Sequence, residues 1–125
     1  MAGKTLYPKR FPVFIEGDVA HKSGPGVSSP GSEITLITES VPSGKIWNLL
    51  GAYGTCFQDG TMRVKINGVV VGSSRTVAGS PNAYFPWVKP KTATSGQVVS
   101  VTFQALSDTP PSDVETYLDV AETSI

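Results

Sequence analysis

The stretch Met62-Arg63-Val64-Lys65-Ile66-Asn67-Gly68-Val69-Val70-Val71 decides the fold class of this chain. Its apolar residues alternate with polar ones up to the Asn-Gly pair, which is the period of a strand with one buried face. Asn-Gly favours the positive φ angles of a two-residue type I′ turn, and three β-branched valines follow it. Such a turn pairs Ile66 with Val69 and Val64 with Val71 on one face of an antiparallel hairpin. The hairpin predicts an all-β protein.

Further strands are predicted on both sides of the hairpin, separated by turns rich in glycine and proline. The clearest alternates apolar and polar residues over 97–106, with Val99, Val101 and Phe103 on one side. We expect strands at 13–19, 33–39, 46–57, 83–88, 97–106 and 114–121, and loops at 22–32, 72–82 and 107–113. In the strand at 46–57, Trp47 and Tyr53 share one parity and should share one face.

About eight short strands with such turns predict a two-sheet antiparallel β-sandwich. A jelly roll is preferred over an immunoglobulin-like sandwich, because the Cys…Trp…Cys framework of the latter is missing from the sequence. The length of 125 residues is typical of a single domain. We expect that domain at 13–125, preceded by an extended arm at 1–12 in which Pro8 and Pro12 favour extended geometry.

The charges of the chain are balanced in number but not in position. Ten basic and ten acidic residues give a net charge of zero, which argues against a nucleic-acid-binding protein. Residues 1–15 carry bases and no acid, whereas residues 108–125 carry acids and no base. Opposite charges at the two ends favour pairing between subunits.

Targeting and membrane segments are not expected. The apolar run at 11–15 is too short for a signal-peptide core and contains a proline, and no run approaches membrane-spanning length. We therefore expect synthesis in a cytoplasm and no membrane partner.

Residues with catalytic or metal-binding chemistry are sparse. Cys56 lies in an apolar stretch and is interpreted as a half-buried small hydrophobic residue, and His21 is expected in a polar loop. One histidine is a poor supply for nucleophilic triads or metal sites, and Asp108 with Asp113 lacks the ligand alternation of a calcium loop. The sequence therefore predicts a protein that is not an enzyme and has no cofactor or metal.

The aromatic segment around Tyr84, Phe85 and Trp87 has three interpretations. Packing in the core is the first. Burial at a subunit interface is the second, because aromatic residues are enriched in interface cores. A stacking platform for sugar rings is the third.

The stretch Val41-Pro42-Ser43-Gly44-Lys45-Ile46-Trp47-Asn48-Leu49-Leu50, followed by the hairpin, by 95–101 and by an acidic terminal strand, resembles a pattern of small phage structural proteins. Over about residues 33–122 the chain looks like a head decoration (cement) protein of a tailed bacteriophage. The resemblance implies a trimeric jelly roll on the outer capsid surface of the virion, which clamps neighbouring major capsid subunits and has no enzymatic activity.

The leading hypothesis is therefore a capsid decoration protein whose partners are the major capsid protein and its own copies, as a homotrimer. Its candidate interface residues are basic or aromatic: Lys4, Tyr7, Lys9, Arg10, Phe11, Phe14, Tyr84 and Trp87. The arm is expected to lie across a neighbouring subunit, with Glu115 and Asp119 among the possible carboxylate partners. The alternative is a carbohydrate-binding module or receptor-binding tail-tip domain, with Trp87 and Tyr84 as the platform.

Overall fold

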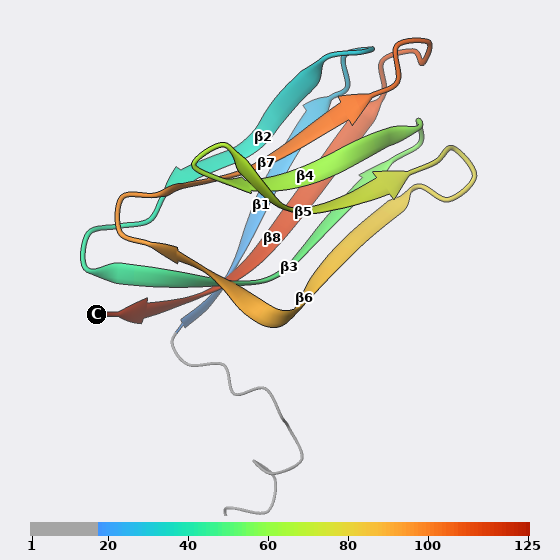
Figure 1. Ribbon diagram of the computed structural model, residues 1–125. Coiled ribbons are helices and arrows are strands. Elements are labelled where there is room, and N and C mark those ends of the chain that lie inside the picture. The colour runs from blue at the N-terminus through green and yellow to red at the C-terminus, as the bar shows by residue number, and fades with distance from the viewer. Residues whose placement is uncertain (1–17) are drawn as a thin grey trace, which may run out of the picture.

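The computed structural model describes residues 18–125, which form eight strands in two packed sheets (Figure 1). The strands are β1 (Asp18–Val27), β2 (Glu33–Ser40), β3 (Lys45–Cys56), β4 (Gly60–Ile66), β5 (Val69–Thr76), β6 (Asn82–Thr94), β7 (Val98–Ala105) and β8 (Asp113–Ser124). The sheet orders are β1-β8-β3-β6 and β2-β7-β4-β5, with antiparallel pairing throughout these named strands. This eight-stranded arrangement is a jelly roll, so the predicted fold class is confirmed.

The hairpin that predicts the fold joins β4 to β5. Asn67 and Gly68 have φ angles of 49° and 80°, as a type I′ turn requires. Ile66 pairs with Val69 as predicted, but a register shift then pairs Val64 with Gly72, so the predicted pairing of Val64 with Val71 is wrong. The register shift places Gly72 against the Phe85 ring. A Cβ at position 72 would lie 2.7 Å from that ring, so this position requires glycine.

The core lies between the two sheets and is formed by the alternate residues of each strand. In β7 the buried members include Val99, Val101 and Phe103, and in β8 they include Leu118 and Val120, as their alternation predicts. Cys56 packs as a small hydrophobic residue, as expected, but it is fully buried in the core and not half-buried.

The predicted strand limits are wrong in three places. Residues 22–27 and 72–76, both expected in loops, belong to β1 and β5. The strand expected at 83–88 continues to Thr94 in β6. Gly24 suits β1 because a Cβ there would lie 2.4 Å from the Leu36 carbonyl oxygen of β2, so the two sheets approach closely at this point. Proline is tolerated in β1 and β6 because each is an edge strand.

A β-bulge in β3 changes which face its aromatic residues occupy. The register with both neighbouring strands shifts between Leu49 and Gly51. Trp47 and Leu49 are buried in the core, whereas Tyr53 lies on the outer side of the sheet, opposite the side of buried Ala52. The expectation that Trp47 and Tyr53 share a face is therefore wrong, because an inserted residue reverses the alternation.

The arm at 1–12, the first part of the strand expected at 13–19 and the candidate residues Lys4, Tyr7, Lys9, Arg10, Phe11 and Phe14 lie outside the described residues. Their roles stay predictions. The described chain enters β1 at Asp18, which pairs with Glu122 near the end of β8.

Candidate functional site

The outer surface of the β1-β8-β3-β6 sheet carries a group of ring side chains that we call the aromatic face: His21, Tyr53, Tyr84 and Tyr117. The strand register places Tyr117 beside Tyr53 and Tyr53 beside Tyr84, which makes a row across β8, β3 and β6. Neighbouring strands lie about 4.8 Å apart, so side chains in such a row are in contact. His21 of β1 and its partner Asp119 of β8 belong to the next row of outward-facing residues.

The four rings form two stacked pairs. The centroids of His21 and Tyr117 lie 5.0 Å apart with 20° between the ring planes. Those of Tyr53 and Tyr84 lie 5.1 Å apart with 12° between the planes. Each ring therefore covers one face of its partner, while Tyr84 remains 56% exposed at the surface. Stacking fixes the orientation of the rings before any partner arrives.

Asp119 connects the two stacked pairs. Its Oδ1 accepts a hydrogen bond from His21 Nδ1 at 2.5 Å, and its Oδ2 accepts one from the Tyr53 hydroxyl at 2.5 Å. The bond to Asp119 and the partial burial of the ring raise the pKa of Tyr53 to about 12. The Tyr117 hydroxyl donates to Glu115, which raises the pKa of Tyr117. Both phenols therefore stay protonated at neutral pH.

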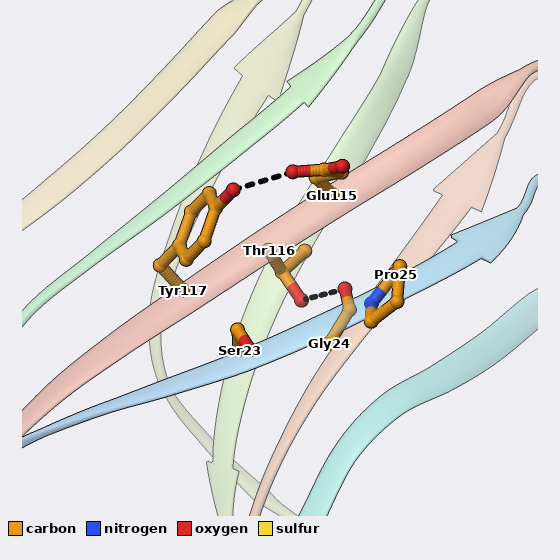
Figure 2. A pocket seen from close by; sticks show the side chains of 6 residues that line it. All are labelled: Ser23, Gly24, Pro25, Glu115, Thr116 and Tyr117. Atoms are coloured by element: carbon orange, nitrogen blue, oxygen red, sulfur yellow. Dashed lines mark hydrogen bonds between the residues drawn. The ribbon is translucent and has the colours of Figure 1, made fainter.

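Two open hollows flank Glu115 and Tyr117. Figure 2 shows the smaller one, of about 140 Å³, between β1 and β8, where Thr116 donates to the Gly24 carbonyl oxygen at 3.0 Å. The larger, of about 370 Å³, is lined by Thr55, Phe57, Ser112, Asp113, Glu115 and Tyr117. We call the larger one the Phe57 hollow. It offers an exposed ring, carboxylates and hydroxyls to a partner.

The chemistry of the aromatic face suits recognition. His21 lies on β1, so its expected place in a polar loop is wrong, and it has a carboxylate partner in Asp119. Cys56 cannot join it, because Cys56 is buried on the inner side of the sheet.

Within residues 18–125 no three histidine, cysteine or carboxylate side chains gather as a metal site. The same residues include no helix with the length and apolarity needed to cross a membrane.

The sequence-predicted candidates Tyr84 and Trp87 lie on opposite sides of β6. Tyr84 belongs to the aromatic face. Trp87 packs against the core, forms an edge-to-face contact with Phe85 at 5.1 Å and donates from Nε1 to the Val71 carbonyl oxygen at 3.2 Å. The two therefore do not form one platform. Phe85 and Trp87 are partly buried by packing, and the interface role of Tyr84 and Trp87 stays a prediction.

Sequence reasoning missed His21, Tyr53 and Tyr117 as members of a site. The parity of β8 carried a signal, because Tyr117 alternates with the inward residues Leu118 and Val120. Tyr53 carried no such signal, since the bulge in β3 reverses its face.

The outer surface of the other sheet is ionic, and we call it the ionic face. Glu33 accepts hydrogen bonds from Thr102 at 2.6 Å, Lys65 at 2.9 Å and Arg63 at 3.1 Å. The bonds from Thr102 and Lys65 contribute most to a pKa of Glu33 of about 2, and Arg63 lowers it further. The Arg63 guanidinium also donates to Gln104 at 2.9 Å. The carboxylate is thus neutralised by groups of its own sheet.

The sequence matches no protein-family model and no curated protein. The structure is similar to the CBM36-1 domain of a multidomain xylanase from the hindgut metagenome of Trinervitermes trinervoides. That pair has a TM-score of 0.50 and 13% identity, and covers 86% of this chain and 100% of that one.

Two further solved structures are similar at TM-scores of 0.48 and 0.49. One is a chain of the acid-stable capsid of Helicobacter pylori bacteriophage KHP30, with 14% identity over 90% of this chain and 97% of that one. The other comes from the disulfide-linked pili that form Bacillus endospore appendages, with 10% identity over 85% and 90%. Identities this low show the fold alone.

Proposed function

We propose that this chain is a non-enzymatic structural protein of a virus particle, which binds the outer capsid surface and bridges major capsid subunits as a homotrimer. The observation that carries the proposal is the aromatic face. It presents tyrosine rings on a broad sheet surface, held by stacking and by hydrogen bonds to Asp119 and Glu115. Tyrosine is enriched in interface cores and among the residues that dominate binding energy.

The mechanism is contact area combined with multivalency. A single copy holds its partner through one surface, and three joined copies hold several partners at once. Linking weak contacts in this way raises the overall affinity by about 10² to 10⁴ without any new contact. The exposed ring of Tyr84 is the natural anchor of the aromatic face. The basic and aromatic residues between Lys4 and Phe14 are expected to add charge and apolar contacts.

Purified particles from producing cells test the proposal. Density-gradient fractions should contain this chain in a fixed ratio to the major capsid protein, measured by quantitative mass spectrometry. Antibody labelling of intact particles should decorate the shell. Absence of the chain from purified particles, or labelling confined to a tail tip, would overturn the proposal.

A carbohydrate-binding role is the second candidate, because Tyr84 is exposed and stacks on Tyr53, whose hydroxyl donates to the Asp119 carboxylate. Sugar rings stack on aromatic faces, and sugar hydroxyls donate hydrogen bonds to carboxylates. Affinity electrophoresis in gels containing soluble xylan, mannan or glucan tests it. Retardation that is lost in Tyr84→Ala but kept in Arg75→Ala, on the ionic face, would favour this role.

A further inference from the structure

The Phe57 hollow combines apolar surface with negative charge. Phe57 follows the end of β3 and is 63% exposed, and Tyr117 lines the same hollow. Asp113 and Glu115 contribute carboxylates to the same lining. A large exposed ring beside two carboxylates fits a partner that brings both apolar side chains and positive charge.

The surrounding sheet supplies no such positive charge. Four successive rows of outward-facing residues, which we call rungs, cross the sheet and begin on β1 with His21, Ser23, Pro25 and Val27. Their partners on the neighbouring strands complete four rows across the sheet. These partners are Asp119, Tyr117, Glu115 and Asp113 on β8, Gly51, Tyr53 and Thr55 on β3, and Pro86, Tyr84 and Asn82 on β6. Three carboxylates lie in the four rungs, and neither lysine nor arginine does. The cationic partner must therefore come from outside this surface.

The chain itself contains a segment of the required composition. The basic residues Lys4, Lys9 and Arg10 are interspersed with the aromatic residues Tyr7, Phe11 and Phe14. The first acidic residue of the chain is Glu16. Residues 1–17 precede the described strand and could span about 60 Å if fully extended. The segment matches the hollow in charge and in side-chain type.

The position of β1 favours delivery of this segment from a second copy. Asp18 pairs with Glu122, whereas the Phe57 hollow lies beside Asp113 at the other end of β8. These two points are about 30 Å apart along the strand. A segment folding back onto its own sheet would use about ten residues to cover that length, besides those needed to reverse its direction, which leaves Phe11 and Phe14 short of the Asp113 end of the hollow.

We propose that the Phe57 hollow binds the basic and aromatic segment at 4–14 of a neighbouring copy of this chain. The aromatic side chains pack on Phe57 and Tyr117, and Lys9 and Arg10 lie near Asp113 and Glu115. Each copy gives one segment and receives one, a head-to-tail contact that closes as a ring. The inference rests on the self-association in the proposed function and names the contact that produces it.

Charge reversal in the full-length chain tests this contact. Lys9→Glu/Arg10→Glu in one variant, or Asp113→Lys/Glu115→Lys in another, should each weaken self-association about tenfold or more at low salt. Sedimentation equilibrium measures the effect. Asp108→Lys, an exposed charge reversal in the neighbouring β7–β8 loop, is the control that should leave association unchanged.

Mixing the two variants distinguishes exchange between copies from contact within one copy. In the mixture the acidic segment of one variant meets the basic hollow of the other, and the reverse contact is matched as well, so mixed complexes should form. Two of the three contacts in a ring of three are then matched, so we expect partial recovery of association. A single chain carrying all four substitutions should recover as well. Recovery only in that single chain would overturn the exchange, because the segment would then bind its own copy.

A cross-link gives a second readout that does not depend on the hollow variant folding. A benzophenone amino acid in place of Phe11 should yield cross-linked dimers whose peptides include residues 55–57 or 112–117. Cross-links to other surfaces, or a wild-type chain that stays monomeric at high micromolar concentration, would overturn the inference. An oligomer that forms but ignores both charge reversals would overturn the inference alone and leave the capsid role to the particle experiment.

Discussion

The two outer faces of this sandwich use carboxylates in different ways. On the ionic face, Glu33 is surrounded by Lys65, Arg63 and the Thr102 hydroxyl, so its charge is neutralised within the sheet. On the aromatic face, Asp119 and Glu115 accept bonds from phenols and an imidazole. A phenol donor orients a carboxylate without cancelling its charge.

This difference separates a stabilising surface from a binding surface. Charges paired on one sheet lose much of their field at a distance, because opposite charges lie within a few ångströms of each other. A carboxylate held by a phenol keeps its field, and an exposed ring beside it keeps its apolar area available. The aromatic face therefore has more to offer a partner than the ionic face, although both have hydrogen-bonded side chains.

Inserting one alanine between Gly51 and Ala52 should break the comparison completely. The extra residue shifts the alternation of β3 by one position, so Tyr53 turns toward the core, Ala52 turns outward, and the aromatic face loses its central ring. We expect a loss of more than about 3 kcal/mol in the free energy of unfolding, or a chain that does not fold. Urea unfolding measures it. Leu50→Ala, which keeps the residue count, should retain the fold, and an insertion variant of near-native stability would show that the residue count of β3 does not set the face of Tyr53.

Glu33→Gln should weaken the ionic face and leave the aromatic face intact. Ionised Glu33 stabilises the fold above its ordinary pKa of 4.5, and this contribution is lost as the pH falls toward its folded pKa of about 2. We expect a loss of about 1 kcal/mol at pH 7 after solvent screening, and a weaker decline of stability between pH 5 and 2. Glu39→Gln, which affects one surface ion pair with Lys22, is the comparison. Equal acid sensitivity in Glu33→Gln and the parent would contradict this account.

Tyr53→Phe should remove one bond to Asp119 and cost about 0.5 to 1 kcal/mol. The raised pKa of Tyr53 means that its stabilising contribution is complete below pH 10 and disappears as the pH rises to about 12. Ultraviolet titration should show one fewer late-ionising tyrosine in the variant. An unchanged titration curve would mean that the Asp119 bond does not hold the Tyr53 proton.

Tyr84→Ser should have the smallest effect on stability, below about 0.5 kcal/mol, because the side chain is largely exposed. It should nevertheless weaken binding to the parent particle about tenfold, as loss of an interface anchor does. Arg75→Ser, an exposed change on the other sheet, should alter neither quantity. Equal binding losses in the two variants would remove the functional distinction between the faces.

The sequence predicted the fold well where alternation is uninterrupted. The β7 and β8 segments and the Asn-Gly hairpin follow directly from local patterns, and their pairing follows from burial of one face. The candidate site was harder, because it depends on features without a local signature. The bulge in β3 reverses Tyr53, and the strand at 22–27 reads as a loop because its glycines are explained only by the approach of Leu36. Aromatic residues from β1, β3, β6 and β8 meet only through the register of four strands.

The burial of Cys56 has a practical consequence for labelling this protein. It is the single thiol in the whole sequence, and its side chain has no exposed surface in the fold. A cysteine introduced at an exposed position would then be the only thiol that a maleimide dye can reach under native conditions. Fluorophores placed one per copy in this way could follow the assembly and exchange of subunits in real time, without first removing the native cysteine.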